Sequence, residues 1–102
     1  MTIIVHATIS TDPGTVDALK SAIAELEQTT RAEPGCIDYV FSTAINDPNT
    51  VRITEHWRSA QALKEHLATP HVAAFSAAMQ QHPPKGMDVK MFEAKEEPFP
   101  PR

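Results

Sequence analysis

The alternation of apolar residues near the start of the chain constrains its fold most. In the segment 2–10 every second residue is apolar, and these residues are Ile3, Val5, Ala7 and Ile9. The positions between them are mixed, because Ile4 is apolar whereas His6 and Thr8 are polar. A period of two with many β-branched side chains indicates a β-strand. Since one side is apolar and the other is half-apolar, this strand needs cover on both faces.

After the first strand, the apolar residues recur at helical spacing and then return to the pattern of β-strands. Asp12 followed by Pro13 predicts a helix start, and we expect the helix to end near residues 33–35. Its apolar stripe recurs at helical spacing at Val16, Leu19, Ile23 and Leu26. Residues 36–45 and 50–57 then predict the two strands of a hairpin, joined by a turn at residues 46–49.

The remainder of the chain predicts two helical pieces and a last strand. Ser59 is the expected N-cap of the first piece, and Thr69 followed by Pro70 opens the second. The prolines at residues 83–84 end the helical region, and residues 88–94 alternate like a strand. The predicted order of elements is therefore β-α-β-β-α-β.

This order is typical of the ferredoxin-like α+β fold, in which helices cover only one face of a four-stranded sheet. The other face would carry Ile4, Val40 and Phe92, so we expect a homodimer packed sheet to sheet. The folded domain is predicted at residues 1–94. Residues 95–102 hold three prolines and form a tail that does not join the sheet.

Composition excludes several classes of protein. The formal net charge is −4 and no basic cluster is present, so we expect no nucleic-acid partner. No apolar run reaches the roughly 18 residues of a membrane span. The single cysteine, Cys36, forms no internal disulfide, and no signal peptide is visible after Met1. We therefore expect a cytoplasmic protein.

One stretch, residues 55–71, contains the only tryptophan and three of the five histidines. Trp57 shares a strand side with Glu55, and it is either a core residue or the wall of a pocket for a flat ring. Tyr39 has an inward ring whose hydroxyl is expected to line a cavity. Phe75 lies on the inner stripe of the last helical piece.

Two histidines of this stretch are candidates for proton transfer. His66 follows Leu63 at helical spacing, so its ring points inward, either as a hydrogen-bonded core residue or as a base. His71 lies at a helix start, where the helix dipole favours a neutral imidazole, so it is either a base or a support of the turn. An inward Glu55 needs a partner, and His66 or Arg52 is expected to supply it. The spacing of these residues matches no established metal-ligand pattern, so no metal is expected.

A longer pattern resembles one known family. Its parts are the segment Arg31-Ala-Glu-Pro-Gly-Cys36, then Tyr39, Asp47-Pro48, Glu55, Trp57, His66 and the segment Thr69-Pro-His71. In this order, within about residues 3–92, they resemble the antibiotic-biosynthesis monooxygenase family, and most closely its small bacterial quinol monooxygenase branch. The resemblance implies a dimeric α/β barrel that acts on quinols and phenols without metal, flavin or haem.

The same resemblance implies a monooxygenase that oxidises a small aromatic hydroquinone or phenol with O₂. His66 is then the first candidate for the base and His71 the second, with Glu55 orienting a histidine. The residues expected to bind the ring are Trp57, Tyr39 and Phe75.

Two alternatives stay open. Haem-degrading relatives combine a first-strand asparagine with a tryptophan and a helical histidine, but here the corresponding residues are Val5-His6-Ala7. A non-catalytic dimer that binds a small aromatic ligand would use the same pocket.

Overall fold

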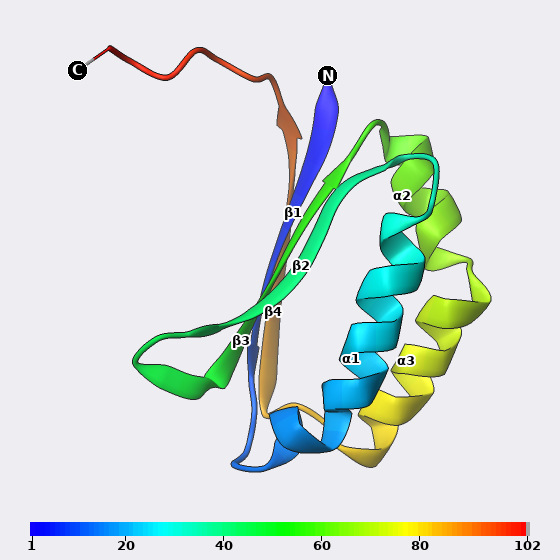
Figure 1. The fold of residues 1–102 in the computed structure, drawn as a ribbon, viewed down its shortest axis with the longest axis vertical. Helices are drawn as coiled ribbons and strands as arrows, with labels where there is room; N and C mark the ends of the chain where they lie inside the picture. Colours follow the sequence, from blue (N-terminus) through cyan, green and yellow to red (C-terminus); the bar gives the residue numbers. More distant parts are fainter. Residues whose placement is uncertain (102) are drawn as a thin grey trace.

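A computed structural model describes residues 1–101 of the chain, so Arg102 of the predicted tail lies outside the described residues. The elements are β1 (Thr2–Ser10), α1 (Thr15–Arg31), β2 (Cys36–Ala44), β3 (Asp47–Trp57), α2 (Ala60–Leu67), α3 (Pro70–Gln81) and β4 (Gly86–Ala94). The strands form one antiparallel sheet in the order β2-β3-β1-β4. This is the predicted ferredoxin-like α+β arrangement, in which the second helical region is divided into α2 and α3 (Figure 1).

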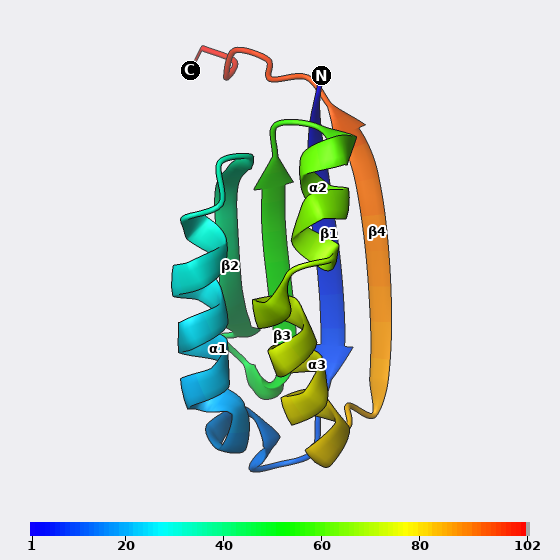
Figure 2. The same cartoon turned by 90° about the vertical axis from the view of Figure 1, so that its right-hand side faces the viewer.

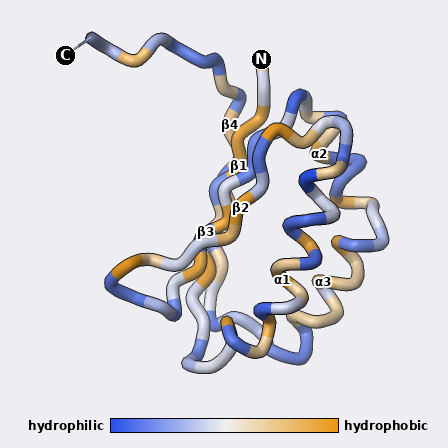
Figure 3. Tube along the Cα trace, viewed as in Figure 1, coloured by the Kyte–Doolittle hydropathy of each residue, from blue (hydrophilic) through white to orange (hydrophobic). Residues whose placement is uncertain are grey.

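The three helices lie on one face of the sheet, and the core lies between the two layers (Figure 1). The four residues on the apolar side of β1, Ile3, Val5, Ala7 and Ile9, are all buried. Val5 pairs with Glu55 and Ile3 pairs with Trp57, so the inward side of β3 continues the same layer. Figure 3 shows apolar residues running along the sheet beneath the helices. Within residues 1–101, no helix is long and apolar enough to cross a lipid bilayer.

Two predicted boundaries are wrong for local reasons. Asp12 does not cap α1 with its side chain; the cap is Gly14, whose φ of 89° suits glycine, and the helix begins at Thr15 instead of Pro13. β3 begins at Asp47 rather than after residue 49, and the turn is shorter than expected. The carboxylate of Asp47 accepts hydrogen bonds from the Thr50 hydroxyl and the Asn49 N–H, and these bonds lower the pKa of Asp47.

The two predicted helix caps in the second half are confirmed. The hydroxyl of Ser59 accepts a hydrogen bond from the N–H of Ala62 at 3.1 Å. The hydroxyl of Thr69 accepts from the N–H of Val72 at 3.4 Å, and Pro70 is the first residue of α3. The new cap at Thr69 separates α2 from α3.

The uncovered surface of the sheet differs from the expectation. Ile4, Val40 and Phe92 do lie on the face without helices, but register places Thr54, Lys90 and other polar residues among them. A more apolar exposed row lies on β4, on the side that faces the helix layer. Its members are Met87, Val89 and Met91, which are 53%, 55% and 60% exposed. The helices do not extend over β4, which explains this exposure (Figure 2).

Candidate functional site

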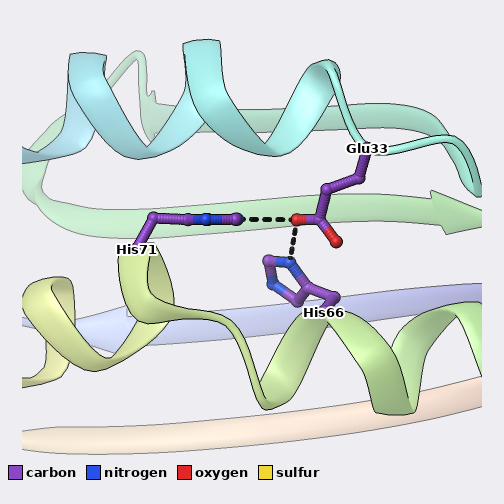
Figure 4. A group of neighbouring side chains, drawn as sticks. All are labelled: Glu33, His66 and His71. Atoms are coloured by element: carbon purple, nitrogen blue, oxygen red, sulfur yellow. Dashed lines mark hydrogen bonds and ion pairs between the residues drawn. The ribbon is translucent and has the colours of Figure 1, made fainter.

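A single carboxylate joins the two candidate histidines. His66 lies in α2, His71 lies in α3, and Glu33 lies in the loop after α1. His66 Nδ1 and His71 Nε2 each lie 2.7 Å from Glu33 Oε2 (Figure 4). The side chains of His66, Glu33 and His71 are 3%, 15% and 20% exposed. The fold therefore brings Glu33, which is distant in sequence, and the two histidines of neighbouring helices into one largely buried cluster.

Backbone features bring these three residues together. A Cβ at Gly35 would clash with the Cβ of Ala62, so only glycine lets the loop after α1 approach α2 this closely. The N–H of Arg58 also donates a hydrogen bond to the carbonyl of Gly35 at 2.9 Å. Ala62 lies one helical turn before His66, so the close approach holds the Glu33 loop beside the buried histidine.

The hydrogen bonds determine which nitrogens are available for chemistry. An ionised carboxylate only accepts hydrogen bonds, so both ring nitrogens that face Glu33 donate to it. In a neutral imidazole the opposite nitrogen then has a free lone pair. These free positions are Nε2 of His66 and Nδ1 of His71. Glu33 thus selects the tautomer of both rings, as an orienting carboxylate does for a catalytic histidine.

Aromatic residues enclose the ring of His66. The ring centroid of Trp57 lies 4.6 Å from that of His66, and the centroid of Tyr39 lies 5.4 Å from it. Trp57 is fully buried, and Tyr39 is buried beside it in the core. Burial raises the pKa of the Tyr39 hydroxyl, and the nearby carboxylate of Glu55 raises it further. Tyr39 therefore remains protonated at neutral pH.

Glu55 points inward as predicted, but its hydrogen-bond partner differs from the prediction. Its Oε1 accepts a hydrogen bond from Nε1–H of Trp57 at 2.9 Å. Arg52 lies on the opposite side of β3, and the carboxylate that contacts His66 is Glu33. Burial raises the pKa of Glu55 and the nearby carboxylate of Glu33 raises it further, while the hydrogen bond from Trp57 and the proximity of His66 lower it.

A cavity of about 150 Å³ lies between α1 and α3. It is lined by Ala22, Glu25, Leu26, His71, Ala74 and Phe75. Of the candidate residues, His71 and Phe75 border this cavity, whereas His66, Trp57, Tyr39 and Glu55 do not. Glu33 thus connects a histidine at the cavity to a second histidine packed among core aromatic residues.

Sequence reasoning did not identify Glu33 as a site residue. One signal was available, because Glu33 lies just after the C-cap of α1, near the negative end of the helix dipole, which disfavours a carboxylate. An acidic residue at that place indicates a compensating donor elsewhere in the fold. The two histidines that compensate it lie 33 and 38 residues away in sequence.

Replacing Glu55 with glutamine is expected to change how stability depends on pH. The raised pKa of Glu55 means that its protonated form is favoured by folding. Its contribution to stability is therefore present below the pKa in the unfolded chain and is lost as pH rises through the pKa in the folded protein. A glutamine still accepts the hydrogen bond from Trp57 and never ionises. Urea unfolding should show a gain in stability for Glu55→Gln at pH 7 that shrinks toward pH 4.

The matched control is Glu65→Gln, because Glu65 is exposed on α2. Its stability difference from the natural protein should stay nearly constant over the same pH range. The stability gain of Glu55→Gln over the natural protein should be larger at pH 7 than at pH 4. A gain that is smaller at pH 7 than at pH 4 would contradict the assigned environment of Glu55.

Comparisons with known proteins agree with this fold. A family model described as antibiotic biosynthesis monooxygenase matches residues 2–78. A proposed antibiotic biosynthesis monooxygenase from Deinococcus radiodurans is 29% identical with a TM-score of 0.87, over 98% of this chain and 99% of that chain. Rv0793 from Mycobacterium tuberculosis is 25% identical with a TM-score of 0.84, over 95% and 98% of the two chains. The uncharacterized protein sll1783 of Synechocystis sp. is 27% identical over 94 residues, which span 92% of this chain but 64% of that protein.

Proposed function

Because this chain belongs to the antibiotic biosynthesis monooxygenase family, we propose that it is a cofactor-independent monooxygenase for a small aromatic hydroquinone or phenol. The observation that supports this most is the histidine pair on Glu33, one member of which borders a cavity. A neutral imidazole with a free nitrogen beside a cavity can remove the proton of a phenolic hydroxyl.

His71 is the residue we assign as the proton acceptor. His66 is the first candidate from sequence, but its side chain is only 3% exposed and it does not border the cavity. His71 borders the cavity and keeps Nδ1 free when its Nε2–H donates to Glu33. In this proposal Glu33 is a positioning residue, and His66 supports Glu33 from the core.

The reaction needs no redox centre in the protein. Loss of the hydroxyl proton to His71 gives an electron-rich phenolate, which passes one electron to O₂. The resulting substrate radical and superoxide form a C–O bond at a ring carbon, and the peroxide then loses water. One oxygen atom of O₂ becomes a ring carbonyl and the other leaves in water, together with the ring and hydroxyl hydrogens. The protein supplies proton removal, orientation and exclusion of bulk water.

The cavity size favours a single-ring substrate. An apolar cavity of about 150 Å³ engineered in another protein binds benzene, and the cavity beside His71 has about the same volume. Leu26 and Phe75 supply apolar walls for the ring, and Glu25 supplies an acceptor for a second hydroxyl. A fused tricyclic phenol would extend beyond this cavity into solvent or would need movement of α1 or α3.

Oxygen uptake by metal-stripped protein tests the proposed reaction. A panel of single-ring hydroquinones, naphthols and anthrones should give substrate-dependent O₂ consumption, fastest with a single-ring compound. Labelled ¹⁸O₂ should place one atom in the product and one in water. Stabilisation of the protein by these compounds without any O₂ uptake would instead identify a non-catalytic binding protein.

We also propose that the working form is a homodimer, and light scattering after size exclusion tests it. The natural chain should be a dimer at micromolar concentration. Ile4→Asp should give a monomer if the open sheet faces pack together, because the interface would then bury an unpaired charge.

Val89→Asp is the matched variant, because Val89 lies on the opposite side of the sheet in the apolar row of β4. Dissociation by Val89→Asp alone would move the interface to that row. A natural chain that is monomeric at these concentrations would contradict the dimer itself.

A further inference from the structure

The cluster of Glu33, His66 and His71 has a second chemical capability. One carboxylate oxygen and two imidazole nitrogens, contributed by three separate segments, all lie within 4.8 Å of one another. Figure 4 shows the two rings pointing toward the same carboxylate from α2 and α3. The three side chains are at most 20% exposed, so the fold presents them together and largely shielded from solvent.

Two imidazoles and one carboxylate form a ligand set that suits first-row divalent metals. Zn²⁺ binds histidine nitrogen and carboxylate oxygen, and a site with three protein ligands leaves one position open. The same donors suit Co²⁺ and Ni²⁺, whereas Mg²⁺ and Ca²⁺ prefer sites made of oxygen alone. Packing of His66 against Trp57 also holds one ligand ring in place, which lowers the entropy lost on binding.

We propose that Glu33, His66 and His71 form a binding site for a divalent transition-metal ion such as Zn²⁺ or Co²⁺. The ion would replace the two N–H hydrogens that face Glu33 and would be bound by Nδ1 of His66, Nε2 of His71 and a carboxylate oxygen. His71 borders the cavity, so the open coordination position is accessible to water from that side. Spacing in sequence did not indicate this site, because Glu33 lies 33 and 38 residues away from the two histidines.

The proposed site has a consequence for the proposed reaction, and this consequence alone rests on that proposed function. When a metal occupies Nε2 of His71, a neutral ring carries its hydrogen on Nδ1. The nitrogen that would accept the substrate proton is then lost. The metal is therefore an inhibitor of the oxygenase reaction rather than a cofactor for it.

Titration of the metal-stripped full chain with Co²⁺ tests the site without any substrate. Calorimetry should show one Co²⁺ per chain. The visible d–d absorption of the bound Co²⁺ should be stronger than that of Co²⁺ in water, because the protein ligands form a site of low symmetry. Loss of a residue that only supports a metal ligand costs about 10- to 100-fold in affinity. Removal of a ligand by His71→Ala or Glu33→Gln should therefore weaken binding by at least about 100-fold. Both variants should retain cooperative thermal unfolding, because neither residue belongs to the core cluster.

The matched controls are His82→Ala and Glu65→Gln, which change an exposed histidine and an exposed glutamate elsewhere. Neither should alter Co²⁺ affinity by more than about twofold. Absence of stoichiometric binding, or binding that survives both His71→Ala and Glu33→Gln, overturns the site and leaves an adventitious ion only.

The metal test and the oxygen-uptake test fail independently. Oxygen uptake without Co²⁺ binding overturns the metal site alone. Stoichiometric Co²⁺ binding lost in His71→Ala supports the metal site even when no tested phenol is oxidised. Oxygen uptake that falls in proportion to Zn²⁺ occupancy supports the inhibitory role, whereas uptake that requires Zn²⁺ overturns that role and the cofactor-independent reaction together.

Discussion

Replacing His71 with alanine is expected to lower kcat for phenol or hydroquinone oxidation by about 10² to 10⁴. That range is the usual contribution of a positioned general base. The loss should appear in kcat more than in KM, because the proton is transferred in the chemical step. The variant should stay folded, since His71 lies near the start of α3 and its side chain is partly exposed. Steady-state O₂ uptake, with circular dichroism to verify the fold, measures the effect.

Two further variants separate the base from its support. Glu33→Gln keeps the shape of the side chain, but its amide N–H₂ donates where the carboxylate accepted, so the tautomer of His71 is no longer fixed. In serine-protease triads the equivalent change costs about 10⁴ in kcat, and we expect a loss in kcat here too. His82→Ala, at the end of α3, should leave turnover unchanged. Near-normal turnover in a folded His71→Ala protein would show that His71 does not accept the proton.

Replacing Trp57 with alanine is expected to destabilise the fold by about 3–5 kcal/mol, the typical cost of removing a large buried aromatic side chain. Trp57 is fully buried among the core residues, and its ring packs on His66. The variant also leaves the carboxylate of Glu55 without its hydrogen-bond donor. Because domains of this size are stable by only about 5–15 kcal/mol, the loss is a large share of the total. Urea unfolding at fixed protein concentration measures it.

Trp57→Phe is the matched variant, because it keeps a buried aromatic ring while it removes the N–H that donates to Glu55 and the five-membered part of the indole. Its loss of stability should be clearly smaller than that of Trp57→Ala. A change in KM with unchanged stability in Trp57→Phe would indicate that Trp57 contacts substrate. Trp57 would then be the pocket wall that the sequence gives as one of two alternatives. A loss below about 1 kcal/mol in Trp57→Ala would contradict its role as a core residue.

The sequence by itself determined the order of strands and helices in this fold, and it determined which side chains point toward the core. The period of two in the first strand places Ile3 and its alternate neighbours inward because strand side chains alternate between faces. The caps at Ser59 and Thr69 are local hydrogen bonds made within three residues, so their residue types are sufficient to predict them. The inward positions of Trp57 and His66 follow from the same local periodicities.

The tertiary structure alone decided which of these side chains meet. Glu33 contacts His66 and His71 only because Gly35 lets the loop after α1 approach α2. The two contacts span 33 and 38 positions in sequence, and no helix or strand period relates residues so far apart. The hydrogen bond of Glu55 with Trp57 is local to β3, but the contact of His66 with Glu33 instead of Glu55 joins separate elements. Local periodicity indicates the direction in which a side chain points, because it follows from backbone geometry. The partner of that side chain depends on how separate elements pack, and so the carboxylate at the centre of the site became visible only in the folded chain.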